Sequence, residues 1–279
     1  MGYKVLARDD ITSESVRMKV AAPHIARKCE PGQFIMFRIN EKGERIPLTI
    51  ADFDRAQGTI TIIFQKVGKS TYHLAELQVG AEIRDFVGPL GRHMDVGKIG
   101  TVACLGGGLG IAPIYPKVRA LKEAGNNVVS IIGARRKDLV ILEAEMRAQS
   151  NELYVTTDDG SYGLHGFVTD QLKLLVDGGR KFDSCLAVGP IPMMEAACKL
   201  TRDLKLPTLV SLDTLMVDGT GMCGSCRVTV AGKTKFTCVD GPVFDGHAVD
   251  WAEAKSRQCR YRPQEAEALE KYRRERGAR

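Results

Sequence analysis

Three cysteines near the end of the chain carry the clearest chemical pattern. Cys223 and Cys226 are separated only by Gly224-Ser225, and Cys238 follows twelve residues later. Two thiolates at this spacing can bind one metal centre without backbone strain. The pattern therefore predicts a metal site, either an iron–sulfur cluster or structural zinc.

The remaining five of the eight cysteines have different surroundings. Cys259 lies in a charged stretch twenty-one residues beyond Cys238 and is an alternative ligand. Disulfides are not expected in a reducing compartment. The other four are predicted to be small buried hydrophobic side chains: Cys29, Cys104, Cys185 and Cys198.

A glycine-rich segment at residues 106–113 follows a predicted strand and opens a predicted helix. Glycine lets backbone N–H groups approach a pyrophosphate, and the helix N-terminus adds its dipole. The spacing differs from the G-x-G-x-x-G fingerprint, so that motif is not assigned. The segment predicts a phosphate site formed by Gly107, Gly108, Leu109, Gly110, Ala112 and Pro113.

Three more predicted strands end in turn-rich sequences. Residues 133–136 follow one strand where a ribose or its 2′-phosphate would lie, and residues 189–194 follow another where they could face a nicotinamide. Residues 156–160 end a further strand. Ligands of parallel sheets bind at the carboxyl ends of the strands, so these ends predict a nucleotide pocket. Its candidates are Gly133, Ala134, Arg135, Asp158, Asp159, Gly160, Gly189, Pro190, Met193 and Met194.

The first part of the chain consists of short alternating or β-branched runs separated by turn signals. Such runs at about ten-residue spacing predict a small antiparallel barrel or sandwich. Residues 69–77 form a plausible helix within it. The predicted strands are Tyr3–Ala7, Val16–Ala21, Gln33–Ile39, Pro47–Asp52, Thr59–Gln65 and Glu82–Phe86.

From Gly97 onward, predicted strands and helices alternate, which is typical of βαβ units on a parallel sheet covered by helices. After Leu215 the chain is rich in Gly and Cys, and it ends in a charged helix over Trp251–Glu275 that is interrupted at Pro263. The predicted strands are 101–105, 128–132, 153–157, 185–188 and 208–212, and the helices are 112–124, 142–149, 169–175 and 192–204. The predicted domains are 1–97, 98–215, 216–250 and a helical tail, 251–279.

Charge and composition exclude several classes of protein. The net charge of +6 from 40 basic and 34 acidic residues is too mild for a dedicated nucleic-acid binder. No apolar run approaches the roughly 18–20 residues of a membrane span, and charges occupy the place of a signal peptide's apolar stretch. We expect a cytoplasmic protein without nucleic-acid or membrane partners. Nine Lys/Arg against four Glu from Lys255 onward predict a tail that docks a partner subunit.

The order of these features resembles the ferredoxin–NADP reductase superfamily: a barrel, the sequence GGGLGIAP at 106–113, VGPIPMM at 188–194, and then the cysteines. Within it, the chain is most similar to subunits with a C-terminal iron–sulfur insert. These include the electron-transfer subunit of dihydroorotate dehydrogenase and the small subunit of electron-bifurcating NADH-dependent reduced ferredoxin:NADP oxidoreductase. The resemblance covers about residues 1–250.

The resemblance implies an FAD on the barrel. In the first flavin motif, Leu48 would replace a stacking aromatic side chain, and Thr49 would offer its hydroxyl to the flavin N5 edge as the catalytic contact. In the second, Gly68, Ser70 and Thr71 would form an anion site for the pyrophosphate. The implied FAD-binding residues are Pro47, Leu48, Thr49, Phe64, Gln65, Val67, Gly68, Lys69, Ser70 and Thr71.

The resemblance also implies the nature of the metal site. The related pattern is C-x4-C-x2-C followed by a fourth cysteine, and Asp218 occupies its first position here. The implied site is a 2Fe–2S cluster held by Asp218, Cys223, Cys226 and Cys238. One alternative is Cys259 as the fourth ligand, and another is structural zinc in place of the cluster. Zinc could not accept single electrons from the flavin.

Together the parts predict an electron-transfer subunit that exchanges hydride with a nicotinamide nucleotide at FAD. Arg135 and Arg136 could clamp a 2′-phosphate, yet related small subunits carry an Arg here and use NAD, so NAD(H) is favoured over NADP(H). The expected partner is a larger flavin or iron–sulfur subunit in a heterodimer of the electron-bifurcating type. One alternative is the electron-transfer subunit of dihydroorotate dehydrogenase, which has a cysteine where this chain has Asp218. Another is a non-catalytic redox sensor.

Overall fold

Alternating apolar residues in the first third of the chain build a seven-stranded antiparallel sheet. The computed structural model, which describes residues 2–277, orders this sheet β6-β1-β2-β5-β4-β3-β7. Its strands are β1 (Tyr3–Asp10), β2 (Ser15–Ala21), β3 (Phe34–Arg38), β4 (Ile46–Asp54), β5 (Thr59–Gln65), β6 (Glu82–Ile83) and β7 (Asp85–Leu90). Two helices accompany it, α1 (Pro23–Ala26) and α2 (Lys69–Glu76).

The single strand predicted over Glu82–Phe86 is wrong, because two strands occupy this stretch. β6 pairs with β1 at one end of the sheet, and β7 pairs with β3 at the other, although only Arg84 separates them. Since the two ends of the sheet are consecutive in the chain, the sheet curls toward closure around a buried core. Phe37, Phe64 and Phe86 are fully buried in that core.

The alternating strands and helices form the second sheet, ordered β11-β10-β9-β8-β12-β13-β16, which confirms the predicted α/β architecture. Its pairs are parallel except β13 with β16. Its strands are β8 (Thr101–Gly107), β9 (Asn127–Ala134), β10 (Glu152–Thr157), β11 (Leu164–His165), β12 (Ser184–Val188), β13 (Thr208–Ser211) and β16 (Val243–Asp245).

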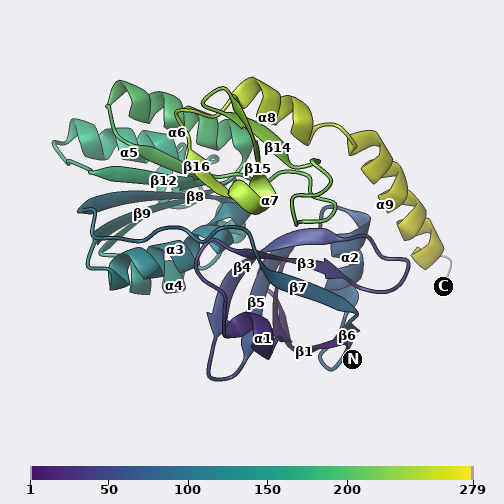
Figure 1. Cartoon of the computed structure of the whole chain (residues 1–279). Helices are drawn as coiled ribbons and strands as arrows, with labels where there is room; N and C mark the ends of the chain where they lie inside the picture. The colour runs from purple at the N-terminus through teal and green to yellow at the C-terminus, as the bar shows by residue number, and fades with distance from the viewer. Residues whose placement is uncertain (1, 278–279) are drawn as a thin grey trace.

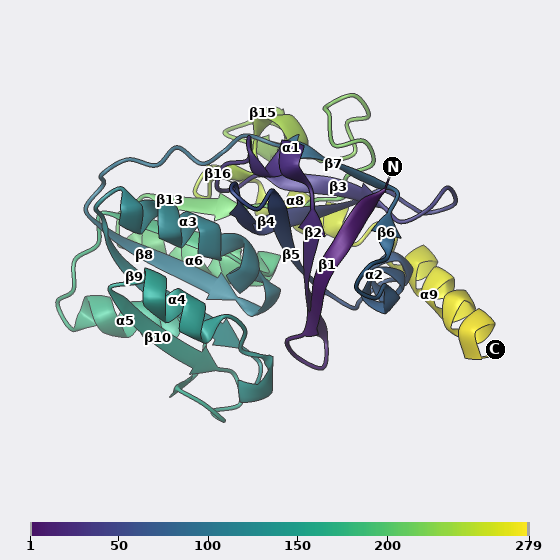
Figure 2. The same ribbon diagram turned by 90° about the horizontal axis from the view of Figure 1, so that it is seen from below.

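Helices cover both faces of this sheet (Figures 1 and 2). α3 and α4 pack on one face and α5 and α6 on the other, each pair over its own apolar core. The helical elements are η1 (Gly108–Gly110), α3 (Ile111–Glu123), η2 (Lys137–Leu139), α4 (Glu143–Gln149), α5 (Val168–Asp177) and α6 (Ile191–Asp203). The chain winds outward from β8 through β9 and β10 and then returns to β12 on the other side of β8. The gap between β8 and β12 is therefore the topological switch point, where such sheets bind ligands.

The cysteine-bearing segment after Leu215 packs against both sheets. It contains β14 (Arg227–Val230), β15 (Lys233–Phe236) and α7 (Thr237–Asp240), and its last strand, β16, adds to the edge of the second sheet. Val228 joins the core beneath α5 and α6. Cys226 and Cys238 instead pack with Phe34 and Met36 of β3. The domain boundaries predicted from sequence stay a prediction.

The tail forms α8 (Trp251–Gln258) and α9 (Arg262–Gly277), and its break lies at Cys259–Tyr261, so the interruption predicted at Pro263 is wrong. Pro263 lies in the first turn of α9, where its missing N–H would have no helical acceptor. α9 reaches the barrel at α2 (Figure 1). Tyr272 donates a 2.7 Å hydrogen bond to Glu76, and Arg273 donates one of 2.8 Å to Tyr72. Part of the basic tail thus contacts the chain's own barrel.

Among the described residues, none of the helices combines the length and the apolar character that crossing a membrane requires.

Candidate functional site

Glycines let the ends of β8 and β12 come together at the switch point. A Cβ on Gly107 would lie 2.2 Å from the sulfur of Met193, in the first turn of α6. A Cβ on Gly110 would lie 2.3 Å from the carbonyl oxygen of Val188. Real Cβ atoms do not approach backbone this closely, so this packing requires glycine at position 110.

One glycine of the same segment faces open space. A Cβ on Gly108 would meet no atom within 4 Å, and the residue has a φ of +54°. It lies in η1, which leads directly into α3, so its backbone is accessible next to a helix N-terminus. This arrangement fits a phosphate group. Ala112 and Pro113 lie in the first turn of α3, and Leu109 lies in η1 beside Gly108.

The two predicted methionines are adjacent in the first turn of α6 but have different surroundings. Pro190 is the N-cap of α6 and adjoins Gly189, and Met193 is directed at Gly107. Met194 is fully buried in the core under α6. Met193 is therefore the methionine whose side chain lies at the switch point.

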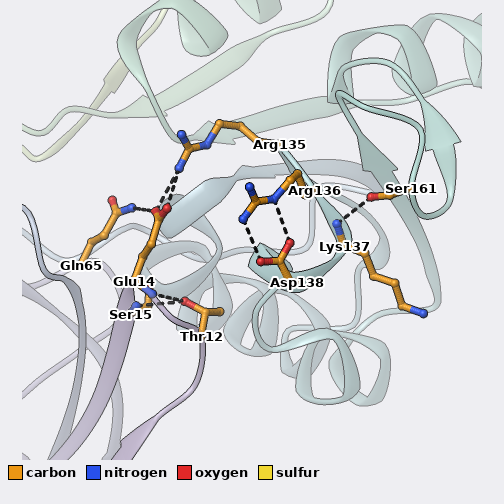
Figure 3. Close-up of polar contacts among 9 residues, drawn as sticks. All are labelled: Thr12, Glu14, Ser15, Gln65, Arg135, Arg136, Lys137, Asp138 and Ser161. Atoms are coloured by element: carbon orange, nitrogen blue, oxygen red, sulfur yellow. Dashed lines mark hydrogen bonds and ion pairs between the residues drawn. The ribbon is translucent and has the colours of Figure 1, made fainter.

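The ends of β9 and β10 form the second half of the predicted nucleotide pocket. Arg135 donates from Nη2 to both carboxylate oxygens of Glu14, at 3.1 and 2.9 Å, and Arg136 forms a two-pronged pair with Asp138 at 3.0 and 2.9 Å (Figure 3). Asp159 accepts a hydrogen bond from the N–H of Ser161. The remaining candidates follow from the same strands: Gly133 and Ala134 end β9, and Asp158 and Gly160 lie in the turn after β10.

The two predicted flavin motifs lie on neighbouring barrel elements. Pro47, Leu48 and Thr49 belong to β4, whereas Gly68 is the N-cap of α2. A Cβ on Gly68 would meet no atom within 4 Å, so the start of α2 faces open space, as an anion site requires. The Thr71 hydroxyl accepts hydrogen bonds from the N–H groups of Val67 and Gly68, both at 3.1 Å, and donates one of 3.0 Å to the Gly68 carbonyl.

Other residues of the flavin motifs have structural contacts of their own. Ser70 donates a 2.5 Å hydrogen bond to Glu44, and Gln65 donates one of 2.6 Å to Glu14. Phe64 is fully buried in the barrel core. Lys69 opens α2 at its exposed end. The roles predicted for these residues in binding FAD stay predictions.

Strand register brings the first flavin motif close to the cysteines. In the antiparallel pair of β3 and β4, Phe34 faces Thr49 and Met36 faces Pro47. Paired residues have their side chains on the same face, with Cβ atoms about 4.5–5.5 Å apart. Phe34 and Met36 pack in one apolar cluster with Cys226 and Cys238. The thiols are thus one strand away from Thr49.

The predicted cluster ligands occupy one loop and one short helix. The Sγ atoms of Cys226 and Cys238 are 3.2 Å apart, too far for a disulfide, and both residues are buried. Asp218 accepts hydrogen bonds of 2.8 Å from the N–H groups of Thr220 and Cys223. Cys223 is exposed, and its Sγ lies 3.1 Å from the Ser225 hydroxyl.

The environments of these groups move their pKa values in opposite directions. Burial raises the pKa of the Cys238 thiol well above its ordinary value. The hydrogen bond from Ser225 lowers the pKa of Cys223, and the N–H of Thr220 lowers that of Asp218. Hydrogen bonds within the protein thus already stabilise the anionic forms of the half-buried Asp218 and the exposed Cys223.

Within residues 2–277, no three or more His, Cys, Asp or Glu side chains are grouped as a complete metal-binding set. The donor chemistry nevertheless fits an iron–sulfur centre, because two facing thiols, a third thiol and a carboxylate lie in one short segment. Cys259 is the exposed C-cap of α8. The four cysteines predicted to be buried, Cys29, Cys104, Cys185 and Cys198, are all buried.

Comparison with known proteins identifies two parts of the chain. Residues 213–250 match the iron–sulfur cluster binding domain of dihydroorotate dehydrogenase B, and residues 104–199 match the oxidoreductase NAD-binding domain. The chain is 47% identical to a dihydroorotate dehydrogenase B (NAD(+)) electron transfer subunit homolog of Thermotoga maritima, over 91% of this chain and 89% of that protein. It is 35% identical to the electron transfer subunit of Fusobacterium nucleatum, over 84% and 92%.

A solved structure resembles the whole chain. It is a chain of the NADH-dependent reduced ferredoxin–NADP oxidoreductase, which was solved for insight into flavin-based electron bifurcation. The two chains are 43% identical, the match covers 98% of each, and the TM-score is 0.93. The likeness therefore extends over both sheets and the cysteine-bearing segment.

Sequence reasoning missed three participants in these sites. Glu14 contacts Arg135 from the turn between β1 and β2, and Phe34 and Met36 line the buried thiols. An acidic residue in a turn and apolar residues in a strand carry no local signal of these roles. Only the register of β3 and β4 and the packing of the two sheets reveal them.

Proposed function

The chain belongs to the family of dihydroorotate dehydrogenase B electron-transfer subunits, and we propose that it exchanges hydride with NAD(H) at an FAD on the barrel and delivers single electrons to a larger partner subunit. The finer part of the proposal is that the partner belongs to an electron-bifurcating NADH-dependent ferredoxin:NADP oxidoreductase. The likeness to a chain of such an oxidoreductase supports this part.

The observation that carries the proposal is the register between β3 and β4. Thr49, the predicted contact to the flavin N5 edge, is paired with Phe34, which packs against the buried thiols. Electron transfer between two centres requires them to be close and shielded from water. Phe34 and Met36 supply an apolar layer between the two predicted sites.

Each part of the chain would contribute one function. A bound flavin supplies the conversion between hydride and single electrons, and a bound iron–sulfur cluster supplies one-electron transfer. The N-terminus of α2 and the glycine-rich start of α3 would hold the pyrophosphates of FAD and NAD(H). Asp218, Cys223, Cys226 and Cys238 would hold a 2Fe–2S cluster, with Thr49 placed at the flavin edge. No side chain is required as a general acid or base.

The face of the cluster loop supports a partner subunit. Met222, next to the exposed Cys223, is 84% exposed, and Val217, next to Asp218, is 54% exposed. Exposed apolar side chains grouped at one place are typical of protein–protein contacts. A partner bound there would cover this loop and approach the predicted cluster.

A second candidate is the electron-transfer subunit of dihydroorotate dehydrogenase B itself. The match of residues 213–250 to that enzyme's cluster-binding domain favours it. Asp218 in place of a cysteine weighs against it. The two candidate functions differ in the partner subunit and its substrate. They are therefore distinguished by assaying the complex of this chain with its partner subunit.

The test begins with the FAD-loaded, iron-loaded protein under anaerobic conditions. We expect rapid flavin reduction by NADH, turnover with an artificial one-electron acceptor, and cluster absorbance between about 400 and 600 nm. Absence of NADH turnover with FAD bound would contradict the proposal. The complex with its partner should then couple NADPH and ferredoxin chemistry to NAD(H); dihydroorotate-dependent NAD reduction would favour the second candidate instead.

A further inference from the structure

An unusual charge pattern surrounds the predicted adenosine end of the nucleotide site. Dinucleotide-binding sheets with NAD specificity commonly place an acidic side chain near the end of the second strand, where it accepts a hydrogen bond from the ribose 2′-hydroxyl. Here β9, the second strand, ends at Ala134 and is followed directly by Arg135 and Arg136. Two arginines at that position would by themselves favour the 2′-phosphate of NADP(H).

Both arginines are paired with carboxylates (Figure 3). Glu14, in the turn between β1 and β2 of the barrel, pairs with Arg135. Asp138, in η2 two residues beyond Arg136, pairs with Arg136. Lys137, the third basic residue here, places its ammonium 5.2 Å from the ring centre of Tyr162. Asp158 and Asp159 adjoin this loop, because their N–H groups donate to the carbonyl oxygens of Ala134 and Arg135 at 3.1 and 3.2 Å. Three basic residues and four acidic ones therefore share this edge of the sheet.

Glu14 is fixed in place. Its N–H donates a 3.1 Å hydrogen bond to the hydroxyl of Thr12, which also accepts one from Ser15 at 2.9 Å. Its carboxylate accepts a further hydrogen bond of 2.6 Å from Gln65. The turn and the end of β5 thus aim Glu14 at the second sheet.

We propose that Glu14 and Asp138 select NAD(H) against NADP(H) by holding the two arginines that would otherwise bind a 2′-phosphate. A 2′-phosphate would have to displace these carboxylates and would approach a site with an excess of acidic groups. A ribose hydroxyl is neutral and can donate a hydrogen bond to a carboxylate. The acidic residue that the second strand lacks is therefore supplied by the other domain. This inference rests on the proposed exchange with nicotinamide nucleotide.

Binding of adenosine nucleotides to the FAD-loaded protein tests this inference without relying on turnover. Calorimetry would compare adenosine 5′-monophosphate with adenosine 2′,5′-bisphosphate, which adds only the 2′-phosphate. We expect the unaltered protein to bind the monophosphate at least as tightly. Because exposed ion pairs contribute little individually, E14Q and D138N should each raise affinity for the bisphosphate a few-fold, and the double variant about tenfold. Affinity for the monophosphate should change less than about twofold.

Two further variants act as controls. E145Q removes the carboxylate on α4 that pairs with Arg17 of β2 at 3.2 Å. It should leave both affinities unchanged. Adding R135Q to the double variant should abolish most of the increase in affinity for the bisphosphate. The ratio of kcat/KM for NADPH over NADH should rise in parallel with the bisphosphate affinity.

The outcomes separate this inference from the proposed function. If the double variant keeps the affinity ratio of the unaltered protein, or if the unaltered protein already prefers the bisphosphate, Glu14 and Asp138 do not select NAD(H). In both cases nicotinamide chemistry itself would stand. If the protein binds neither nucleotide and does not react with NADH, the proposed function fails, and this inference with it.

Discussion

The carboxyl edge of the second sheet and the cysteine-bearing segment after Leu215 position their binding groups by different means. At the sheet edge, parallel strands buried on both faces fix the backbone, and glycines such as Gly110 allow the strand ends to meet. The cysteine-bearing segment has a two-stranded ribbon and a short helix, and its small apolar cluster includes the thiols of Cys226 and Cys238. From this difference we expect that topology sets the predicted nucleotide site, whereas the predicted cluster site depends on its ligand for part of its stability.

Removing the metal or one buried thiol should have the largest effect of the changes that test this contrast. Cys226→Ser, or iron chelation, should reduce cluster absorbance to less than about a tenth and open residues 213–250, because a small segment without its metal loses its main cross-link. Hydrogen exchange should show lost protection there and unchanged protection in β8 and β9. Cys198→Ser, in the core under α6, is the matched control and should keep the absorbance. A cluster-free segment that stays fully protected would remove the contrast.

A steric change should damage the sheet edge instead. Gly110 has an ordinary φ of −59°, so Gly110→Ala acts only through the clash of its Cβ with the Val188 carbonyl. We expect the free energy of unfolding to fall by about 1–3 kcal/mol and nucleotide affinity to fall more than about tenfold, because the strand ends must separate. Urea unfolding and calorimetry measure the two effects. Gly97→Ala, where a Cβ would meet no atom within 4 Å, should change neither.

A buried lysine lies in α3, one of the helices that cover the second sheet. Lys117 in α3 is fully buried, its ammonium donates a 3.0 Å hydrogen bond to Ser211, and burial lowers its pKa to about 7. Its nearest titratable neighbour is Cys104, whose pKa burial raises to about 12. Between about pH 7 and the ordinary lysine pKa, the unfolded chain binds the extra proton. Stability should therefore rise with pH across that window.

Lys117→Met isolates this contribution. The variant should be more stable by about 1–4 kcal/mol near pH 7, because it removes a buried ionisable group while keeping its volume. The gain should shrink as the pH rises toward the ordinary lysine pKa of 10.5, because the unfolded chain then also begins to lose the proton. Chemical unfolding of both proteins from pH 6.5 to 10 measures this difference. A gain that is independent of pH would show that Lys117 does not titrate in this range.

The smallest effect is expected where the tail meets the barrel. Arg276 pairs with Glu76 on α2, and both side chains are more than a third exposed. Arg276→Ala should lower the unfolding free energy by less than about 1 kcal/mol, and less still at high salt. Unfolding at two ionic strengths checks this. A loss of unfolding free energy above about 2 kcal/mol would mean that the tail is an integral part of the barrel.

Much of the architecture follows from sequence pattern. The strand over Thr59–Gln65 has its predicted bounds, and the alternation after Gly97 predicts the α/β sheet, because periodicity and glycine-rich turns are local signals. The predicted strand over Glu82–Phe86 and the break at Pro263 are wrong for related reasons. A change of strand partner at Arg84 and the tolerance of proline in a first helical turn depend on surroundings that the local sequence does not contain.

The sequence by itself determined which groups could do chemistry: the spacing of Cys223, Cys226 and Cys238, the glycines of residues 106–110, and the arginines after β9. Only the tertiary structure decided which of them meet. Strand register pairs Phe34 with Thr49, and Phe34 belongs to the same apolar cluster as Cys226 and Cys238. Packing of the two sheets brings Glu14 to Arg135, a partner 121 residues away. The physical reason is that residue type and spacing act locally, whereas register and domain packing are set by the summed burial of apolar surface across the whole chain.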